Sequence, residues 1–577
     1  MSELPISPAQ RDALRERAER WLAHDPDPDT VAELRGLLDD ADDTLLEARF
    51  SDRLPFGTAG IRGVIGAGPA AMNRLVVRQV TAGLAQRLLQ EPQATQRGVV
   101  VGCDARHKSA EFADDAAAVF TAAGLPVYRF AGPVPTPLVA FAVRMLSAVG
   151  GVQVTASHNP ATDNGYKVYW GDGGQITAPL DEQIAAAIDG LGEPWEVVLA
   201  ESDDALLSPV PPGVLDSYVQ RALDTRLHPG STDLRIVYTP LHGVAGATVA
   251  ELFARAGYDD FDTVMEQSAP DPDFPTVAFP NPEEPGALDL ALALAQESDA
   301  DLLLANDPDG DRIAAAIPVG NLWRVLSGDE IGCLLADHLL TYGDGGPERI
   351  VATTVVSSRL LSRIAEDHGV GYVETLTGFK WLAREAAAAE SQGKRMVLAY
   401  EQALGVMVGD MVRDKDGITA ALSFADMAAS LAAQGLTVQD ALDDLARRFG
   451  VHATAGRNLR LEGPDADALV RRTLERLRDD VRVIGGVEVT AIADFDAGVK
   501  RGMDGSLEQL TVPPTDLVSL ELADGSRLQA RPSGTEPLLK FYIEVVEPVD
   551  ATVAEARSRA DVRLKALAEA LLAVASA

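Results

Sequence analysis

Short apolar runs alternate along this chain with stretches in which apolar residues recur at helical spacing. Residues 98–102, GVVVG, are typical of a buried strand, residues 110–123 of a helix, and residues 126–130 of the next strand. The same alternation starts again near residue 234 and near residue 349. This order of elements predicts an α/β protein with three successive α/β domains of similar topology.

The pattern changes after about residue 459, where two helical stretches flank a region of mixed strands. We therefore expect a smaller C-terminal α+β domain after the three α/β domains. The N-terminal ~45 residues are charged and helix-like, and they carry no readable chemistry. The four domains are expected at residues 1–207, 208–320, 321–450 and 451–577, arranged around a central cleft.

In each α/β unit, the last clear strand ends in a polar cluster. These three clusters begin at Ser157, Asp307 and Glu401. Ligands of open α/β sheets bind beyond the carboxyl ends of the strands. The three clusters are therefore candidates for one shared site in the cleft.

Three aspartates alternate directly after an apolar, strand-like run. At strand spacing, the carboxylates of Asp307, Asp309 and Asp311 point to the same side. Three like charges on one face call for a cation between them, and oxygen-only ligands suit Mg²⁺, Mn²⁺ or Ca²⁺. An EF-hand loop would need Gly and Glu where Arg312 and Pro318 stand. The cluster therefore predicts a hard divalent cation site rather than a solvated acidic loop.

Ser157 stands between an apolar strand and Asn159-Pro160. Alone, it is compatible with a plain turn, with a Ser–His pair involving His158, or with a phosphorylated serine. Neighbouring side chains on an extended backbone point apart, and no G-x-S-x-G motif surrounds this serine, which disfavours the Ser–His pair. Three carboxylates leave positions on an octahedral cation that phosphate oxygens usually occupy. The aspartates therefore favour the phosphoserine interpretation.

Arg531 opens the sequence RPSGTEP near the C-terminus. Its guanidinium group, the hydroxyls of Ser533 and Thr535, and the backbone N–H groups of a tight loop at Gly534 suit a bound phosphate. The same composition is also common in ordinary turns, so this loop alone is only suggestive of a phosphate site.

The bulk composition excludes several classes of protein. The 577 residues carry a net charge of −37, so neither a nucleic acid nor an anionic membrane is an expected partner. No apolar run approaches the ~20 residues of a membrane span, and the charged N-terminus does not resemble a signal peptide. Cys103 and Cys333 lie in unrelated patterns, which favours a cytoplasmic protein without a disulfide scaffold.

In this order, the serine, aspartate and C-terminal phosphate motifs resemble the α-D-phosphohexomutase superfamily, in particular its phosphoglucomutase/phosphomannomutase branch. The likeness extends over nearly the whole chain and includes features of the larger, type II phosphoglucomutases. Further stretches that carry it are residues 56–63, 102–106, 135–137, 155–160, 164–167, 241–243, 281–286, 307–312 and 377–380.

The resemblance implies a mutase in which Ser157 carries a phosphoryl group. Asp307, Asp309, Asp311 and a phosphate oxygen on Ser157 would hold Mg²⁺. The phosphoserine would convert a hexose monophosphate into a hexose 1,6-bisphosphate, which then returns its other phosphate to the serine. Glucose 1,6-bisphosphate is therefore expected as activator and intermediate.

The resemblance also implies roles for further residues. Arg62 and Lys167 would offset the charge of the transferring phosphoryl group. The general base stays open among His158, Lys167 and Lys380. The residues expected to bind the phosphosugar are Thr58, Arg312, Thr377, Gly378, Glu401, Arg531, Ser533, Gly534 and Thr535.

The expected sugar-binding stretch departs from the pattern of the family. Many members have Glu-x-Ser-Gly, whereas this chain has EQALG at residues 401–405 and lacks the serine hydroxyl. We expect interconversion of glucose 1-phosphate and glucose 6-phosphate, with phosphomannomutase, phosphopentomutase and sugar-bisphosphate synthase as alternatives. A metal-dependent phosphatase and a non-catalytic sugar-phosphate sensor are alternatives of other classes. The expected partner is a small phosphosugar, and the expected state is a monomer or homodimer.

Overall fold

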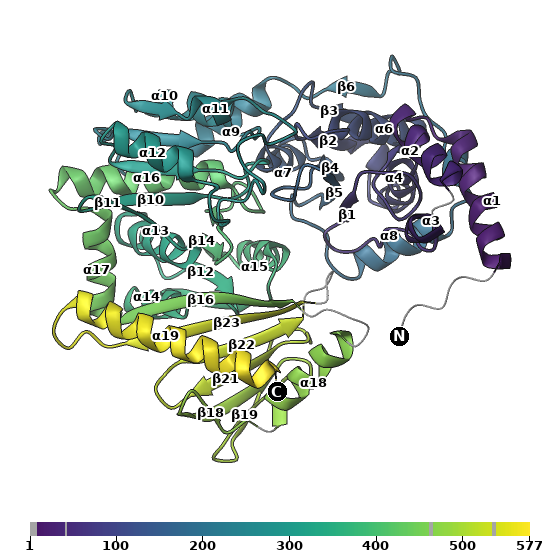
Figure 1. Cartoon of the computed structure of the whole chain (residues 1–577). Helices are drawn as coiled ribbons and strands as arrows, with labels where there is room; N and C mark the ends of the chain where they lie inside the picture. The colour runs from purple at the N-terminus through teal and green to yellow at the C-terminus, as the bar shows by residue number, and fades with distance from the viewer. Residues whose placement is uncertain (1–7, 41–42, 461–465, 480, 533–537, 577) are drawn as a thin grey trace.

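Four β-sheets follow one another along the chain in the computed structural model, each with its own helices (Figure 1). The structure describes residues 8–40, 43–460, 466–479, 481–532 and 538–576. The first three sheets contain parallel strands flanked by helices, and the fourth is antiparallel. This confirms the predicted α/β class with a C-terminal α+β unit.

The first sheet has six strands in the order β1-β5-β4-β2-β3-β6. The central strand β2 is buried at every position, as its continuous apolar sequence predicts. The strands are β1 (Ile61–Val64), β2 (Val99–Cys103), β3 (Val127–Arg129), β4 (Gly150–Val154), β5 (Asp163–Trp170) and β6 (Leu207–Pro209). The helices of this part are α1 (Pro8–His24), α2 (Pro28–Asp39), α3 (Asp43–Phe50), α4 (Arg74–Leu88), α5 (Ala94–Arg97), α6 (Ser109–Ala122), α7 (Thr136–Met145) and α8 (Leu180–Asp189), with a 3₁₀ turn at Pro194–Glu196.

The second sheet has the order β11-β10-β9-β7-β8. Its strands are β7 (Ile236–Thr239), β8 (Phe261–Thr263), β9 (Leu302–Ala305), β10 (Ala314–Val319) and β11 (Leu322–Val325). Its helices are α9 (Gly213–Leu223), α10 (Gly246–Ala256), α11 (Met265–Ser268) and α12 (Asp289–Glu297). Strand β8 ends at Thr263, and helix α11 begins two residues later, at Met265. Residue 320, the expected end of this domain, lies in the turn of the β10–β11 hairpin.

The third sheet has the order β13-β12-β14-β15. Its strands are β12 (Arg349–Thr354), β13 (Gly371–Thr375), β14 (Arg395–Glu401) and β15 (Gly405–Val408). Its helices are α13 (Gly328–Tyr342), α14 (Leu360–Asp367), α15 (Phe379–Ser391), α16 (Gly417–Ala433) and α17 (Val438–Phe449). Helix α16 is buried along most of its length, which makes it a central packing element between the units.

The fourth sheet pairs its neighbours antiparallel in the order β16-β23-β22-β21-β18-β19-β20, with β17 against β18. Its strands are β16 (Val451–Arg460), β17 (Val483–Ile484), β18 (Val487–Asp494), β19 (Val499–Gly502), β20 (Leu507–Gln509), β21 (Val518–Leu522), β22 (Arg527–Pro532) and β23 (Leu538–Glu547). Helices α18 (Ala466–Asp479) and α19 (Val553–Ser576) pack on this sheet and correspond to the two predicted helical stretches of the C-terminal domain. Among the described helices, none has the length and apolarity to cross a membrane.

Candidate active site

Ser157 follows β4 in a left-handed backbone conformation, with φ of 54°. A non-glycine residue in this region carries a strain of about 1–3 kcal/mol, which surrounding contacts must offset. The Ser157 N–H donates to the Thr155 hydroxyl at 2.8 Å, and the residue is buried. The chain thus stops extending at Ser157 and turns its hydroxyl toward the second domain.

Arg106 fixes the loop that contains Ser157, residues 157–163, through hydrogen bonds to its backbone. Its guanidinium donates to four backbone carbonyl oxygens, at distances of 2.5–3.2 Å; these belong to Ser157, Asn159, Pro160 and Asp163. Arg106 is buried, and Asp104 lies 3.4 Å from its Nε atom. Sequence analysis assigned no role to this arginine, because its carbonyl partners lie about 50 residues away in the chain.

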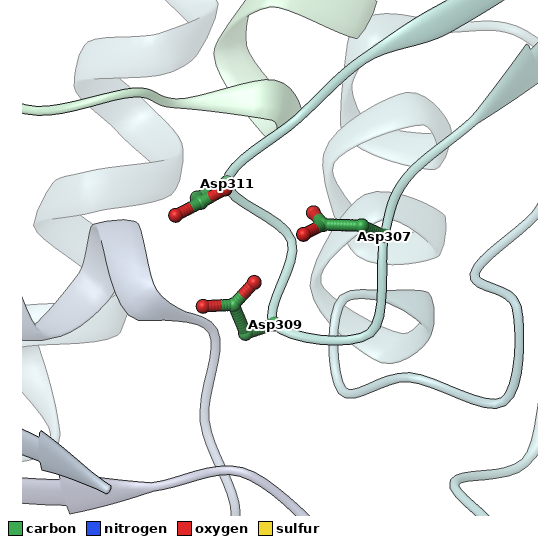
Figure 2. Close-up of side chains that lie close together, drawn as sticks. All are labelled: Asp307, Asp309 and Asp311. Carbon is green, nitrogen blue, oxygen red and sulfur yellow. The ribbon is translucent and has the colours of Figure 1, made fainter. Parts of the chain in front are cut away.

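The three predicted metal ligands lie together on the loop after β9. Figure 2 shows the carboxylates of Asp307, Asp309 and Asp311 pointing toward one another. One oxygen from each lies within 4.8 Å of the others, and all three residues are fully buried. The Ser157 hydroxyl donates to Asp307 Oδ2 at 2.7 Å, across 150 residues of sequence. The serine and the aspartates, which we expected at one shared site, therefore lie side by side.

In Asp309 and Asp311, lysine ammonium groups and a threonine hydroxyl contact only one of the two carboxylate oxygens. Asp309 Oδ2 accepts hydrogen bonds from Thr136 Oγ1 at 2.6 Å and from Lys167 Nζ at 2.7 Å. Asp311 Oδ2 faces Lys167 Nζ at 2.7 Å and Lys415 Nζ at 3.1 Å. Within the described part of the chain, neither Asp309 Oδ1 nor Asp311 Oδ1 has a hydrogen-bond donor.

The charges at this site fit a bound cation. Burial, followed by the charges of Asp309 and Asp311, raises the pKa of Asp307 well above its usual range. Buried carboxylate oxygens without donors are costly unless a cation binds them. Oxygen-only ligands on a short loop suit Mg²⁺, so the residues present fit the predicted metal.

His158 contacts the serine, contrary to the expectation that the two side chains would point apart. The Ser157 hydroxyl lies 3.0 Å from His158 Nδ1 because the positive φ of Ser157 bends the backbone. Burial, followed by the charges of Arg312 and Arg62, lowers the pKa of His158 well below its usual range. The imidazole is therefore neutral and can accept or donate one hydrogen bond at each end.

Two more predicted residues of the first domain reach the site at its rim. Arg62 is exposed, and its Nη1 donates to Asn159 Oδ1 at 3.0 Å, beside the serine loop. Thr58 accepts a hydrogen bond from Lys380 Nζ, which joins the first domain to the third. Burial lowers the pKa of Lys380. Gly378, with φ of 108°, directly precedes α15, which carries Lys380, and the neighbouring Thr377 is half-buried.

Arg312 connects the loop that carries the three aspartates, residues 307–312, with Glu283 and His158. Its backbone N–H donates to Asp307 Oδ1 at 2.9 Å, and its guanidinium lies 3.2 Å from Glu283 Oε2 and 3.4 Å from His158 Nε2. Its main chain also pairs with Gly405, the last residue of the expected sugar-binding stretch. The predicted substrate-binding arginine is thus fixed beside the serine and the aspartates.

Lys415 also lies at this site, although no role was predicted for it from the sequence. Burial alone would lower its pKa, but the carboxylates of Asp311 and Asp414 raise it, so the ammonium group stays charged. Its stem crosses Gly405, where an added Cβ would lie 2.5 Å from Lys415 Cδ and 3.1 Å from Glu401 Cγ. Burial raises the pKa of Glu401 above its usual value, although the positive charge of Lys415 offsets part of this rise. Lys415 therefore connects the sugar-binding stretch with the metal loop.

The C-terminal phosphate loop is described only in part. Arg531 is half-buried, and its Nε donates to the Tyr542 hydroxyl at 3.3 Å. The predicted phosphate-binding residues Ser533, Gly534 and Thr535 lie outside the described residues.

Four family models match this chain in order. Their descriptions are phosphoglucomutase/phosphomannomutase alpha/beta/alpha domain I at residues 53–194, domain II at residues 216–320, domain III at residues 327–449, and C-terminal domain at residues 469–562. Together with the fold, these matches define a mutase, an enzyme of the isomerase class. The chain belongs to the phosphoglucomutase/phosphomannomutase family, as its resemblance to the α-D-phosphohexomutase superfamily predicted.

Relatives whose names refer to different sugars match nearly the whole of this chain. A probable phosphoribomutase of Schizosaccharomyces pombe is 40% identical over 92% of this chain and 93% of its own. A phosphoglucomutase of Staphylococcus epidermidis is 34% identical over 85% of this chain and 90% of its own. The open form of the Paramecium phosphoglucomutase parafusin has the same fold, with a TM-score of 0.68 at 19% identity over 91% of this chain and 96% of that one. The family is therefore established, and the relatives' names span more than one sugar.

Proposed function

We propose that this enzyme moves a phosphoryl group between Ser157 and the two ends of a sugar phosphate, interconverting α-D-glucose 1-phosphate and glucose 6-phosphate. One observation carries this proposal. The Ser157 hydroxyl lies 2.7 Å from Asp307, beside carboxylate oxygens of Asp309 and Asp311 that have no donor among the described residues. A phosphoryl group on this serine would therefore lie next to the metal ligands.

Asp307, Asp309, Asp311 and a phosphate oxygen on Ser157 are the groups that would hold Mg²⁺. When bound, the ion supplies positive charge that stabilises the transferring phosphoryl group. Thr136, Lys167 and Lys415 orient the aspartates by binding their other oxygens.

The chain's own residues would complete the transfer in two matching steps. The bond from Ser157 Oγ to phosphorus breaks as a sugar hydroxyl forms a new bond to phosphorus. A base takes the proton of the sugar hydroxyl, and the released Ser157 oxygen takes up a proton to become a hydroxyl. The resulting glucose 1,6-bisphosphate then returns its other phosphate to Ser157 by the reverse chemistry. Of the three candidate bases, His158 contacts the serine hydroxyl, Lys167 is paired with two carboxylates, and Lys380 is bonded to Thr58.

The remaining predicted residues would bind the sugar and its second phosphate. Arg62 lies beside the serine loop and would offset the phosphoryl charge. The proposed substrate-binding residues are Thr58, Arg312, Thr377, Gly378, Glu401, Arg531, Ser533, Gly534 and Thr535. We propose that the domains at residues 1–207, 208–320, 321–450 and 451–577 each supply one part of this site. We further propose that the enzyme is cytoplasmic, is a monomer or homodimer, and acts on a small phosphosugar.

A pentose phosphate is the second candidate substrate. The S. pombe relative that is 40% identical carries the name probable phosphoribomutase. The chain also has Ala403 where many family members have a serine hydroxyl for the sugar. A smaller sugar with fewer hydroxyl groups would need fewer partners in the loop after Glu401.

A panel assay separates these candidates. Purified protein with Mg²⁺ and a trace of glucose 1,6-bisphosphate receives the 1-phosphates of glucose, mannose, glucosamine and ribose, with Ser157→Ala in parallel. We expect isomerisation of glucose 1-phosphate, no free phosphate, and loss of activity in the variant. A strong preference for ribose 1-phosphate would favour the second candidate. Free phosphate as the main product, or full activity of Ser157→Ala, would overturn the phosphoserine mechanism.

A further inference from the structure

Three helices, α1 to α3, precede the first matched family model, which begins at residue 53. Figure 1 shows them in purple against the outer side of the first domain. Trp21 of α1 is buried and packs edge-on against Phe50, with ring centroids 6.0 Å apart, and against Trp195, at 6.4 Å. These helices are therefore fixed to the domain that contains the serine loop.

The first polar contact of these helices is an ion pair with Lys108. Lys108 Nζ donates to Asp27 Oδ1 at 3.0 Å and to Asp29 Oδ2 at 2.6 Å. Asp27 is buried and also caps α2 by accepting the Asp29 N–H. The Asp29 side chain is 75% exposed, so its part of the interaction is largely screened by solvent. Asp27 is therefore the partner that fixes Lys108.

Lys108 belongs to the segment that holds the serine loop. Two residues before it, Arg106 donates to the backbone carbonyls of residues 157–163. One residue before it, the His107 carbonyl accepts a hydrogen bond from Asn164 Nδ2 at 2.9 Å. Lys108 itself has a left-handed φ of 64°, directly ahead of α6. Such a conformation persists only where surrounding contacts hold it.

The second polar contact reaches the loop after β1. Glu33 of α2 accepts hydrogen bonds from the Ala67 N–H at 2.8 Å and from Arg49 Nη2 at 2.9 Å. Gly66 and Gly68 lie so close to α3 that an added Cβ would be 2.8 Å from the Arg49 guanidinium and 2.6 Å from the Arg49 carbonyl oxygen, respectively. Strand β1, which ends just before this loop, carries Arg62.

We propose that the N-terminal helices brace the serine loop and the loop after β1, with Lys108 as a positioning residue for Ser157. The proposal rests on the mutase function proposed above. The Asp27–Lys108 pair fixes the segment of Arg106, and Arg106 fixes the carbonyls of the serine loop. A small displacement of a reacting group lowers the rate strongly, whereas substrate binding elsewhere in the cleft is unaffected. The brace therefore acts on kcat rather than on KM.

Lys108→Met and Asp27→Asn test this role in the full chain. Methionine keeps most of the lysine stem without its charge, and asparagine caps a helix about as well as aspartate, so both changes remove mainly the ion pair. We expect kcat to fall about tenfold in each variant, with KM changed less than about twofold. The double variant should lose no more than either single variant, because the two groups act as a pair.

Backbone hydrogen exchange over residues 156–163 gives a readout that needs no catalysis. We expect faster exchange there in Lys108→Met than in the wild type, and no change in Lys565→Met, whose lysine is exposed on α19. Unchanged exchange and unchanged kcat, with only a lower thermal midpoint, would overturn the proposal and leave a purely structural contact. Additive losses in the double variant would also overturn it. Should the wild type lack mutase activity, the proposed function fails, and the exchange comparison still decides whether the brace exists.

Discussion

Lys167→Met should destabilise the protein when no divalent cation is present. The Lys167 ammonium donates to Asp309 and Asp311 at 2.7 Å each, and its side chain is 8% exposed. Removing one partner of a buried ion pair costs about 3–5 kcal/mol because the other charge stays buried. Asp309 keeps Thr136 and Asp311 keeps Lys415 in the variant, so we expect the lower end, about 3 kcal/mol.

Thermal unfolding in EDTA measures this cost. For a domain of 150–250 residues, 1 kcal/mol shifts Tm by about 2–4 °C, so the first transition should fall by about 6–12 °C. Mg²⁺ should reduce the difference, because a cation on the Oδ1 oxygens of Asp309 and Asp311 replaces part of the lost charge. Lys565→Met, on the exposed surface of α19, serves as the control. An equal Tm for Lys167→Met and wild type in EDTA would refute the assignment of these pairs as a stabilising element.

Two further changes test other parts of the structure. Gly405→Ala places a methyl group 2.5 Å from Lys415 Cδ and 3.1 Å from Glu401 Cγ, so KM for the sugar phosphate should rise about tenfold. Gly213→Ala, whose added methyl group meets no atom within 4 Å, is the control. Equal KM values for Gly405→Ala and the wild type would contradict a sugar-binding role for residues 401–405. Burial raises the pKa of Asp329 to about 6, so its ionisation costs no stability below pH ~4, an increasing amount between pH ~4 and pH 6, and the full amount above pH 6. Asp329→Asn should therefore gain up to about 3 kcal/mol relative to wild type between acidic and neutral pH in thermal unfolding, and a pH-independent difference would argue against this titration.

Much of the fold could be predicted because burial leaves a direct mark on the sequence. Strands such as β2 and β9 are buried at every position and read as continuous apolar runs. The polar residues that follow them, Ser157 and the aspartates, meet because strand ends of α/β sheets lie at one edge. The resemblance to a known family then supplied the order of the domains, and the family matches confirm that order.

Other features depend on backbone conformations and partners that no local pattern specifies. The Ser157–His158 contact follows from a positive φ at a serine, where the sequence suggests an extended strand end. The sequence does not specify the partners of Arg106 and Lys415, because both are buried against groups distant in the chain.

The aspartate site also determines how three domains fit together. Asp311 belongs to the second sheet's loop, whereas Lys167 comes from β5 of the first sheet and Lys415 from the third domain. Beside Lys167 on β5, the Tyr169 hydroxyl donates to Asp414 at 2.9 Å, next to Lys415 in the chain. The buried negative charge of the aspartates is thus balanced by lysines that only the assembled domains can supply. Domain assembly and the proposed metal site therefore depend on the same charges, so we expect a change at either lysine to alter both the stability of the interface and the affinity for a divalent cation.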